Sequence, residues 1–355
     1  MVIMKLSLLL QEAVLSYQKA VFRCHKKYLT SFYFYDIVCL EYIKRLEHGG
    51  TLKVFVTGGT GFVGRNVVSK LIEHGHNAVL LVRAQHSLKH MESFAGRLNF
   101  VNGSIQDIDI LKKGIRGCDA VIHLVGIIRE VGSNTFKSVH YEGTRNVIEA
   151  SRSAGVRRFI HMSAEGTKPS STSNYHKTKF MAEEHLKSSG LKYTIFRPSM
   201  LFGPGDKNFN VLADLIRKAP FVPVIGDGNY KWQPVSVKNV AELFVLALEN
   251  QRAESKIYEV RGPDVFTFNR ILDILMKLLG IKRPKVHIPA AIAGPIIHIL
   301  DKFLSSPPIT SDQLKMLLDN YDHQAGDLLI DFDINLIPFE KGLREYISKG
   351  GKIHE

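Results

Sequence analysis

The sequence predicts an α/β protein with a doubly wound parallel sheet, followed by a smaller mixed C-terminal domain. Two observations predict this fold class. Short apolar runs alternate with helix-period segments from Lys53 to the helix that begins near Asn174, and the first apolar run enters its helix through a glycine-rich turn. Helices then cover both faces of the sheet, and ligands bind beyond the carboxyl ends of the strands.

The composition is that of a globular chain. Its 355 residues suffice for one large or two modest domains, and 45% of them are hydrophobic and 23% charged. The three cysteines are scattered, and no C-x-x-C or H-E-x-x-H pattern occurs, so we predict neither a disulfide framework nor a metal site. We therefore expect a reducing, cytoplasmic location.

The net charge of +13 raises the question of an anionic partner. It arises from 47 Lys and Arg against 34 Asp and Glu, but the basic pairs are far apart and lack interleaved aromatic residues. This dispersal favours a solvated basic surface over nucleic-acid binding.

Residues 1–51 differ from the rest of the chain. Gln11 and Glu12 interrupt the first apolar run, which argues against an export signal, and the stretch from Phe32 to Leu40 is too short to span a bilayer. We expect a gene-model extension, with translation beginning near Leu52. An amphipathic helical arm for a partner is the alternative.

The run from Lys53 to Thr57 predicts a strand, and the segment from Arg65 to Glu73 predicts a helix. Between them, Gly58 permits a tight turn, Gly61 lets the backbone approach a diphosphate, and Gly64 lets the helix pack on the strand. The phosphates would bind the amides at the helix N-terminus. A structural turn is the alternative. The predicted cofactor-binding residues of this turn are Thr57, Gly58, Thr60, Gly61, Phe62, Val63 and Gly64.

A second strand, from Ala78 to Val82, ends at Arg83. An NAD-preferring protein places an acid here to bind the adenosine ribose, but none occurs between Glu73 and Glu92. We expect Arg83 to bind a 2′-phosphate, helped by Arg65 and Lys89, which favours NADP(H) over NAD(H). A solvated loop arginine is the alternative.

The alternation continues along the chain. Strands are predicted for Leu98 to Val101, Asp119 to Val125 and Arg158 to Met162, and helices for Ile108 to Gly114 and Phe136 to Ala154. His123 and His161 fall within these strands and are expected to be satisfied core histidines rather than ligands.

Tyr175 and Lys179 are four residues apart on a predicted helix, so they share one face. A nearby ammonium would lower the tyrosine pKa from about 10 and prepare Tyr175 for proton exchange with a substrate. Lys179 could also hold ribose hydroxyls. An exposed helix face is the alternative.

The chain resembles the extended or atypical members of the short-chain dehydrogenase/reductase superfamily, a Rossmann-fold family. Four motifs carry this resemblance, in the family's order: TGGTGFVG at 57–64, VIHLVG at 121–126, YHKTK at 175–179 and RPSMLFGPGD at 197–206. Within this superfamily the chain is most similar to the subgroup of the nucleotide-binding accessory subunit of respiratory complex I and its bacterial relatives. Three segments carry this narrower resemblance: HMSAEGTKPSSTSNYHKTK at 161–179, KWQPVSVKNVA at 231–241 and PITSDQLKML at 308–317. The resemblance implies three further contacts: Ser104 and Ile105 at the adenine, Leu124, Val125 and Gly126 along the cofactor, and Pro198 and Ser199 at the nicotinamide.

Two positions depart from the active members of the family. Ala164 occupies the place of the substrate-orienting hydroxyl, with Ser163 one residue early, and a one-residue slip in a strand reverses the side chain. Ser170, Ser171 or Ser173 could substitute. His140 stands where the family has a water-positioning asparagine.

Two helices are predicted in the C-terminal part, Val240 to Leu248 and Phe268 to Leu279, the second ending at Gly280. Ile288 to Ile297 is apolar and contains two prolines, so a helix there should be kinked or broken. Core packing is the simplest interpretation. The alternative is an apolar wall for a lipid-like or quinone-like substrate, or a membrane or partner contact, with Lys282, Arg283 and Lys285 facing headgroups.

These patterns predict an extension over 1–51, a dinucleotide-binding domain over 52–264 with 205–235 contributing to the substrate side, and a small domain over 265–355. The first functional hypothesis is an NADP(H)-dependent oxidoreductase or epimerase-like enzyme with Tyr175 as acid/base, assisted by Lys179 and Ser163. The second is a non-catalytic NADPH-binding subunit or assembly factor of a respiratory complex. For either function we expect no transmembrane span and a cytoplasmic location, with a peripheral position at the inner face of a membrane as the alternative.

Overall fold

The computed structural model describes residues 50–83, 94, 96–304, 307, 309–318 and 328–347. The chain divides into two units, Met1–Gly50 and Thr51–Glu355, and all the elements below belong to the second unit. The extension predicted over 1–51 lies almost wholly outside the described residues.

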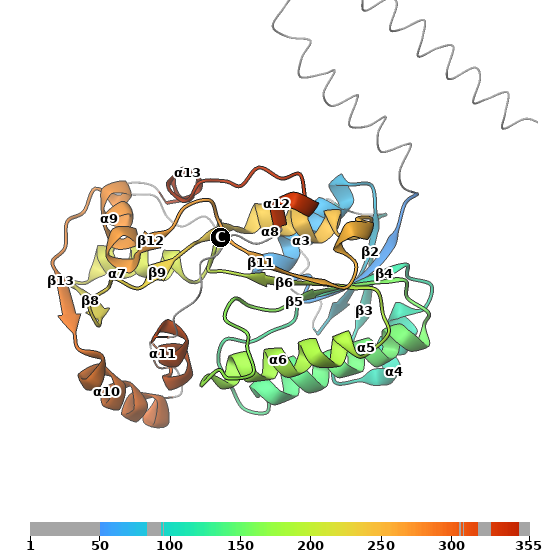
Figure 1. The fold of residues 1–355 in the computed structure, drawn as a ribbon, viewed down its shortest axis with the longest axis horizontal. Coiled ribbons are helices and arrows are strands. Elements are labelled where there is room, and N and C mark those ends of the chain that lie inside the picture. The colour runs from blue at the N-terminus through green and yellow to red at the C-terminus, as the bar shows by residue number, and fades with distance from the viewer. Residues whose placement is uncertain are drawn as a thin grey trace, which may run out of the picture. The chain divides into compact units, whose positions relative to one another are not determined.

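A seven-stranded parallel sheet forms the centre of the second unit, in the order β11-β6-β5-β4-β1-β2-β3 (Figure 1). The chain leaves β1 on one side for β2 and β3 and on the other side for β4, β5 and β6, which is the doubly wound order. This confirms the predicted fold class. The strands are β1 Lys53–Thr57, β2 Asn77–Val82, β3 Leu98–Asn102, β4 Ala120–His123, β5 Arg158–Met162, β6 Tyr193–Pro198 and β11 Lys256–Val260.

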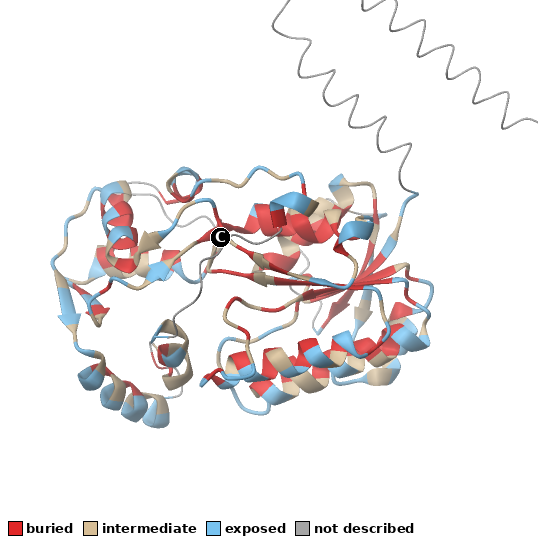
Figure 2. Ribbon diagram, viewed as in Figure 1, coloured by how far each residue is buried: buried red, intermediate tan, exposed pale blue. Residues whose placement is uncertain are grey.

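Alternation along each strand explains why helices cover both faces. In β1, Val54 and Val56 pack in one hydrophobic cluster with α3 and α8, whereas Phe55 packs in a second cluster with α4, α5 and α6. Both faces of the central strands are buried, which Figure 2 shows as red strands between two helical layers, whereas the edge strand β3 is partly exposed. These helices are α3 Phe62–Glu73, α8 Val237–Leu246, α4 Ile108–Ile115, α5 Gly143–Ser153 and α6 Asn174–Lys187.

Three predicted helices differ clearly from those observed. The helix expected from Val240 to Leu248 is α8, which begins three residues earlier, at Val237, because Ser236 is its N-cap. The helix expected from Arg65 begins at Phe62, because Gly61 is its N-cap. The helix expected from Phe136 to Ala154 consists of a π-helical segment, η3 (Lys137–Glu142), followed by α5. π-Helical turns inside helices often mark functional sites.

The rest of the unit packs in three places: α7, α9 and α13 form a third hydrophobic cluster, α10 and α11 form a small fourth one, and α12 joins the first. Three short two-stranded sheets join its segments: β10 with β7, β12 with β9, and β13 with β8. The elements are β7 Leu201–Phe202, α7 Phe209–Lys218, β8 Val222–Ile225, β9 Lys231–Trp232, β10 Val235–Ser236, η4 Gln251–Ala253, β12 Phe266–Thr267, α9 Phe268–Leu279, β13 Lys285–Ile288, α10 Ala290–Phe303, α11 Ser311–Leu318, α12 Leu328–Asp331 and α13 Phe339–Arg344.

The predicted limits of α9 are confirmed, including its end at Gly280. Gly280 has φ +69° and donates to the Lys277 and Met276 carbonyls, a left-handed cap that glycine adopts at low cost.

The apolar stretch from Ile288 to Ile297 differs from the prediction. α10 continues through Pro295, and its buried residues are Ala293 and Ile297, so core packing is the wrong interpretation for most of this segment.

No helix in the described part of the chain combines the length and the apolarity that crossing a bilayer requires.

Candidate nucleotide-binding and catalytic site

The turn between β1 and α3 is closed by its glycines. Gly58 has φ +75°, and the Gly61 amide donates to its carbonyl over 3.0 Å. A Cβ on Gly64 would lie 2.0 Å from that same carbonyl oxygen, so no side chain fits there. The turn therefore has the compact shape that lets a backbone approach a diphosphate.

The N-terminus of α3 suits an anion. Gly61 provides no side-chain cap, and the first turn contains no acidic residue. The first amides of a helix lack partners within the helix and carry the positive end of its dipole. The residues present thus fit a dinucleotide diphosphate.

Two predicted cofactor residues of this turn have their side chains in the interior. Thr57 is fully buried, with Oγ1 2.6 Å from His123 Nδ1, and Val63 belongs to the hydrophobic core. Both can contact a cofactor only through the backbone. Thr60 is exposed and Phe62 is half-buried.

Arg83 is exposed at the carboxyl end of β2, where the adenosine ribose of a dinucleotide would lie. Its expected helper Arg65 is engaged elsewhere, because its Nη2 donates to the Pro204 carbonyl over 3.2 Å. That Arg65 assists in a phosphate clamp with its other guanidinium nitrogens stays a prediction. Lys89 lies outside the described residues.

Ser104 and Ile105 follow β3 at the same edge of the sheet. Ser104 is half-buried, and its carbonyl accepts from the Asp107 amide. Ile105 is buried under α5, where a Cβ on Gly143 would lie 2.3 Å from its Cδ1.

The loop after β4 connects the glycine turn to α6. A Cβ on Gly58 would lie 3.1 Å from the Val125 amide nitrogen and 3.2 Å from the Leu124 carbonyl carbon. At Gly126 the nearest atom to such a Cβ is Lys179 Nζ, at 3.2 Å. The predicted nucleotide turn and the predicted catalytic lysine thus contact one loop.

Lys179 is almost completely buried, at 2% exposure, and donates from Nζ to the Met162 carbonyl over 3.0 Å. Burial lowers its pKa to about 8, while Glu183 acts in the opposite direction. Tyr175 is half-buried on the same helix, and desolvation raises its pKa to about 12. The predicted lowering of the Tyr175 pKa is therefore wrong, because desolvation of the phenolate raises it.

His140 lies in η3 against Tyr175, with the two rings edge to face and 5.0 Å apart. Thr178 donates its single hydroxyl hydrogen to the Asn174 or Tyr175 carbonyl. Its Oγ1 can therefore only accept from His140, whose Nδ1 lies 3.1 Å away and carries the ring hydrogen. The neutral ring can then accept the Ile127 amide at Nε2 over 3.0 Å. Burial, chiefly, lowers the His140 pKa to about 2. Both ring nitrogens are engaged by the protein, unlike those of a water-positioning residue.

Three of the four predicted hydroxyl groups make contacts within the protein. Ser163 is buried, and its Oγ lies 3.4 Å from Thr167 Oγ1. Ser171 Oγ accepts from the Ser173 amide, and Ser173 caps α6 by accepting from the His176 amide. Ser171 and Ser173 therefore hold the helix start, and Ser170 is exposed.

The two strand histidines lie in the core, as predicted. His123 bonds Thr57 and Thr144 through its two nitrogens, and burial lowers its pKa to about 3. His161 stacks on His123 with ring centroids 5.4 Å apart. Neither of its buried nitrogens has a hydrogen-bond partner in the described structure, so the expectation that it is satisfied is wrong.

The residues predicted at the nicotinamide end, Pro198 and Ser199, are buried at the end of β6. The Pro198 carbonyl accepts from the Glu165 amide, and the Ser199 amide donates to Val260. Glu165 in turn accepts from Arg261 Nε over 2.5 Å, which fixes the loop after β5 to the segment after β11.

The sequence analysis missed Asp312, the second residue of α11. Its carboxylate accepts from Ser173 Oγ at 2.7 Å, from the Asn174 amide at 2.8 Å and from the Tyr175 amide at 3.2 Å. An anion is favourable at this helix N-terminus. Asp312 lies 137 residues from Tyr175, and no local pattern marks it as a cap for α6.

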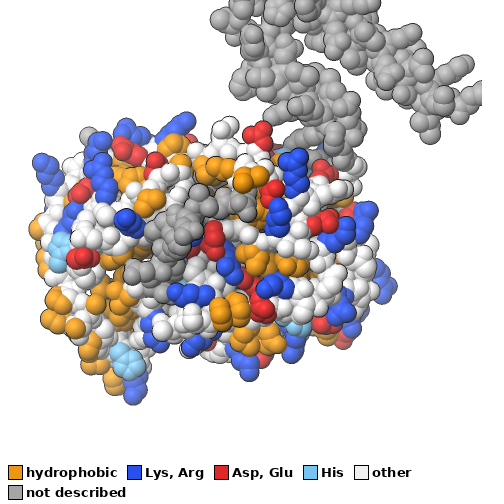
Figure 3. Space-filling view, in the orientation of Figure 1, with side chains coloured by type: hydrophobic (Ala, Val, Ile, Leu, Met, Phe, Trp, Pro, Cys, Tyr) orange, Lys and Arg blue, Asp and Glu red, His pale blue; other side chains and the backbone are white. Residues whose placement is uncertain are grey.

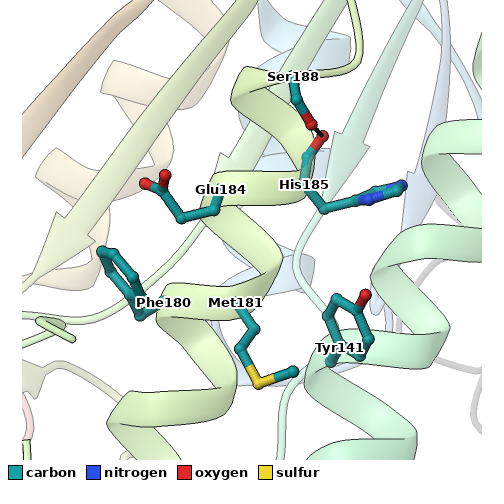
Figure 4. A pocket seen from close by; sticks show the side chains of 6 residues that line it. All are labelled: Tyr141, Phe180, Met181, Glu184, His185 and Ser188. Atoms are coloured by element: carbon teal, nitrogen blue, oxygen red, sulfur yellow. Dashed lines mark hydrogen bonds between the residues drawn. The ribbon is translucent and has the colours of Figure 1, made fainter.

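A shallow surface hollow lies on the outer side of α6 and η3. Tyr141, Phe180, Met181, Glu184, His185 and Ser188 line it (Figure 4). The residues of α6 that line it differ from the buried ones, which include Lys179. The hollow is therefore separate from the predicted nicotinamide end.

Comparisons with known proteins agree with this architecture. The chain is similar to NADH dehydrogenase (ubiquinone) 1 alpha subcomplex subunit 9, mitochondrial, of Arabidopsis thaliana, at 30% identity over 297 residues that cover 80% of this chain and 73% of the relative. It is similar to 4-hydroxy-2-methyl-3-oxo-4-farnesyl-3,4-dihydroquinoline-1-oxide ketoreductase of Stigmatella aurantiaca, at 28% identity over 269 residues, 70% of this chain and 79% of the relative.

Among solved structures, dTDP-glucose 4,6-dehydratase from Bacillus anthracis in complex with NAD has a TM-score of 0.66 at 18% identity, covering 84% of this chain and 96% of that one. This likeness supports the fold. The NAD dependent epimerase/dehydratase family matches residues 54–260, which include the glycine turn, Tyr175 and Lys179. The resemblance expected from the motifs is confirmed, and the chain belongs to the NAD dependent epimerase/dehydratase family.

Proposed function

We propose that the protein binds NADP(H) and reduces a carbonyl group of a lipid-like or quinone-like substrate, with Tyr175 as the proton donor. The observation that carries this proposal is the arrangement of α6, which brings Lys179 to the same loop as the glycine turn. The Stigmatella relative is by name a ketoreductase of a farnesylated ring compound, which supports an apolar carbonyl substrate.

The preference for NADP(H) rests on Arg83. It is exposed at the end of β2, and the sequence has no acid between Glu73 and Glu92 to bind a ribose hydroxyl. A guanidinium binds a phosphate through paired N–H groups. The family's description names NAD, so the 2′-phosphate preference is a property that we propose for this chain.

Bound NADPH would supply a hydride to the carbonyl carbon. The raised pKa keeps Tyr175 protonated at neutral pH, so its hydroxyl can transfer a proton to the carbonyl oxygen as negative charge develops there. Lys179 lies one helical turn from Tyr175 and next to Gly126, and it is largely cationic below pH 8, so its ammonium would favour the phenolate left behind. The reaction direction that best fits a protonated tyrosine is reduction.

Replacement Tyr175→Phe tests the proposal. NADPH oxidation is measured with a panel of short-chain quinones and steroid ketones, and NADPH binding by calorimetry. We expect turnover to fall by about 10²–10⁴-fold while binding is retained. The control is Tyr141→Phe, which removes a hydroxyl from the outer hollow and should leave both unchanged. Equal turnover in the Tyr175→Phe variant and the parent would refute the catalytic role.

The second candidate function is a non-catalytic NADPH-binding subunit or assembly factor of a respiratory complex. The engagement of both His140 nitrogens and the buried Ser163 hydroxyl favour it, as does the name of the Arabidopsis relative. In that case cells that carry Tyr175→Phe would behave like cells with the parent protein. A variant that no longer binds the nucleotide would lose the cellular function of the protein. Co-purification of the intact chain with a respiratory complex would support this function.

A further inference from the structure

α10 has two apolar faces, and one of them is exposed to solvent. Ala293 and Ile297 pack with Leu314 of α11 in a small buried cluster. On the other side, a stripe of four side chains recurs at helical spacing. These are Ile292, Ile296, Ile299 and Phe303, which are 56%, 51%, 57% and 78% exposed, and we call them the α10 stripe.

The stripe lies where hydrophobic atoms gather on the surface. Figure 3 shows orange side chains over the region of α10 and α11, with histidine and basic side chains at its edge. Figure 2 shows most of α10 as exposed. A contiguous exposed apolar patch of this kind commonly marks an interaction site.

The charges on α10 are arranged asymmetrically. Lys302 is exposed, and no carboxylate partner is described for it. The helix has one carboxylate, Asp301, which accepts from the Ser311 amide over 2.8 Å and is thereby held at α11. Lys302 is therefore the more exposed of the two formal charges on this helix, within a chain of net charge +13.

Two of the three cations expected to face headgroups are engaged within the protein. Arg283 donates to the Ile216 carbonyl, and Lys285 pairs with Asp273 over 2.7 Å. The prediction for Arg283 and Lys285 is therefore wrong. Lys282 is exposed, and Lys302 is the cation nearest in sequence to the stripe.

We propose that α10 docks in the plane of an anionic lipid bilayer, with the stripe inserted at the acyl boundary and Lys302 at the headgroups. A helix of 14 residues is about 21 Å long, too short to span but long enough to lie in the interface. A stable protein interface uses roughly 20–30 residues on each side, far more than the stripe provides. Apolar side chains inserted on one face, with a cation at the headgroups, are the pattern of interfacial helices.

Docking at α10 would bring the candidate site close to the membrane phase. α11 packs against α10 and carries Asp312, which accepts from the Tyr175 amide. A lipid-like or quinone-like substrate would then be available beside the catalytic helix. This link rests on the proposed function, whereas the docking itself does not.

Vesicle co-sedimentation of the full chain tests the docking. The probes are phosphatidylcholine vesicles with about 30 mol% phosphatidylglycerol and vesicles of phosphatidylcholine alone. We expect clear binding to the anionic vesicles and a loss of at least about tenfold in the double variant Ile296→Gln/Ile299→Gln. The control is Val211→Gln/Val265→Gln, which removes two exposed apolar side chains that lie outside α10 and α11 and should bind like the parent.

Lys302→Glu separates the electrostatic contribution. It should weaken binding to anionic vesicles at low salt and leave the weaker binding to neutral vesicles unchanged. The proposal is overturned if the double Gln variant binds as the parent does. It is also overturned if the parent binds no vesicles. A dimer seen by light scattering in the parent and lost in the double Gln variant would then assign the stripe to a contact between two copies of the chain. NADPH binding by the double variant should match the parent, so that failure of the docking and failure of the proposed function give different results.

Discussion

Lys179 is a cation that the fold removes almost entirely from water. Burial lowers its pKa from 10.5 to about 8. The unfolded chain therefore binds more protons than the folded chain between about pH 8 and pH 10.5, and stability rises with pH in this window. Below pH 8 the charged side chain destabilises the fold by a constant amount, and this destabilisation fades as the pH rises to 10.5.

Replacement Lys179→Met should remove this dependence. Between pH 7 and pH 10 the free energy of unfolding of the parent should rise by about 2 kcal/mol relative to that of the variant. Only the parent has a buried ammonium that loses its proton in this range. Urea titrations at the two pH values measure it. Lys177→Met, at an exposed position of the same helix, is the control and should show no such change. A constant difference for Lys179→Met would contradict a buried charge.

At the scale of single elements, α6 depends on a residue from a distant helix. Asp312 accepts from two backbone amides of the first turn of α6 and from its N-cap, Ser173. The same carboxylate thus satisfies amides that the helix itself leaves unpaired and fixes the start of the helix that carries Tyr175.

Replacement Asp312→Asn should cost about 1–2 kcal/mol of stability, because the amide loses the charge that favours the N-terminus of α6. If Tyr175 is catalytic, turnover should fall while the Kd for NADPH stays constant. Chemical denaturation and steady-state kinetics measure the two effects. Asp214→Asn, which removes a half-exposed pair with Arg217, is the control, and a matching loss of stability there would argue against the cap.

The glycine turn before α3 gives a second prediction at this scale. Gly64→Ala would place a Cβ against the Gly58 carbonyl, so the turn must open, and we expect nucleotide binding to be lost. Gly280→Ala is a matched control, because its φ of +69° should cost about 1 kcal/mol without touching the turn. Calorimetry with NADPH distinguishes them: similar affinities in both variants would mean that the turn does not bind the nucleotide.

At the scale of the whole molecule, the sheet holds two hydrophobic clusters on its two faces, and the proposed nucleotide site lies at the edge where its strands end. A ligand that binds only the folded chain stabilises the whole unit by mass action. Stability in the presence of each nucleotide therefore reports cofactor preference.

We expect NADPH at about 100 times its Kd to stabilise the parent by about 2.7 kcal/mol. NADH at the same concentration should stabilise it less. In Arg83→Ala this advantage of NADPH should disappear, because the 2′-phosphate loses its guanidinium partner. Thermal unfolding with each nucleotide measures this. An equal reduction for both nucleotides in Arg83→Ala would mean that the arginine does not recognise the phosphate.

The sequence alone determined the features that depend on neighbouring residues. The apolar run before Gly58, the turn that follows it, and the amphipathic α9 with its end at Gly280 are local patterns, because propensity, periodicity and glycine conformation act over a few residues. The same logic located Tyr175 and Lys179 on one helix, although the sequence could not show how deeply the helix is buried.

Only the tertiary structure decided the properties that depend on contacts between distant segments. Desolvation raised the pKa of Tyr175, Pro204 engaged Arg65, Asp312 capped α6, and packing on α11 left the α10 stripe exposed. Each arises from residues far apart in the chain, and the charge, pKa and exposure of a side chain are set by whatever the fold packs against it.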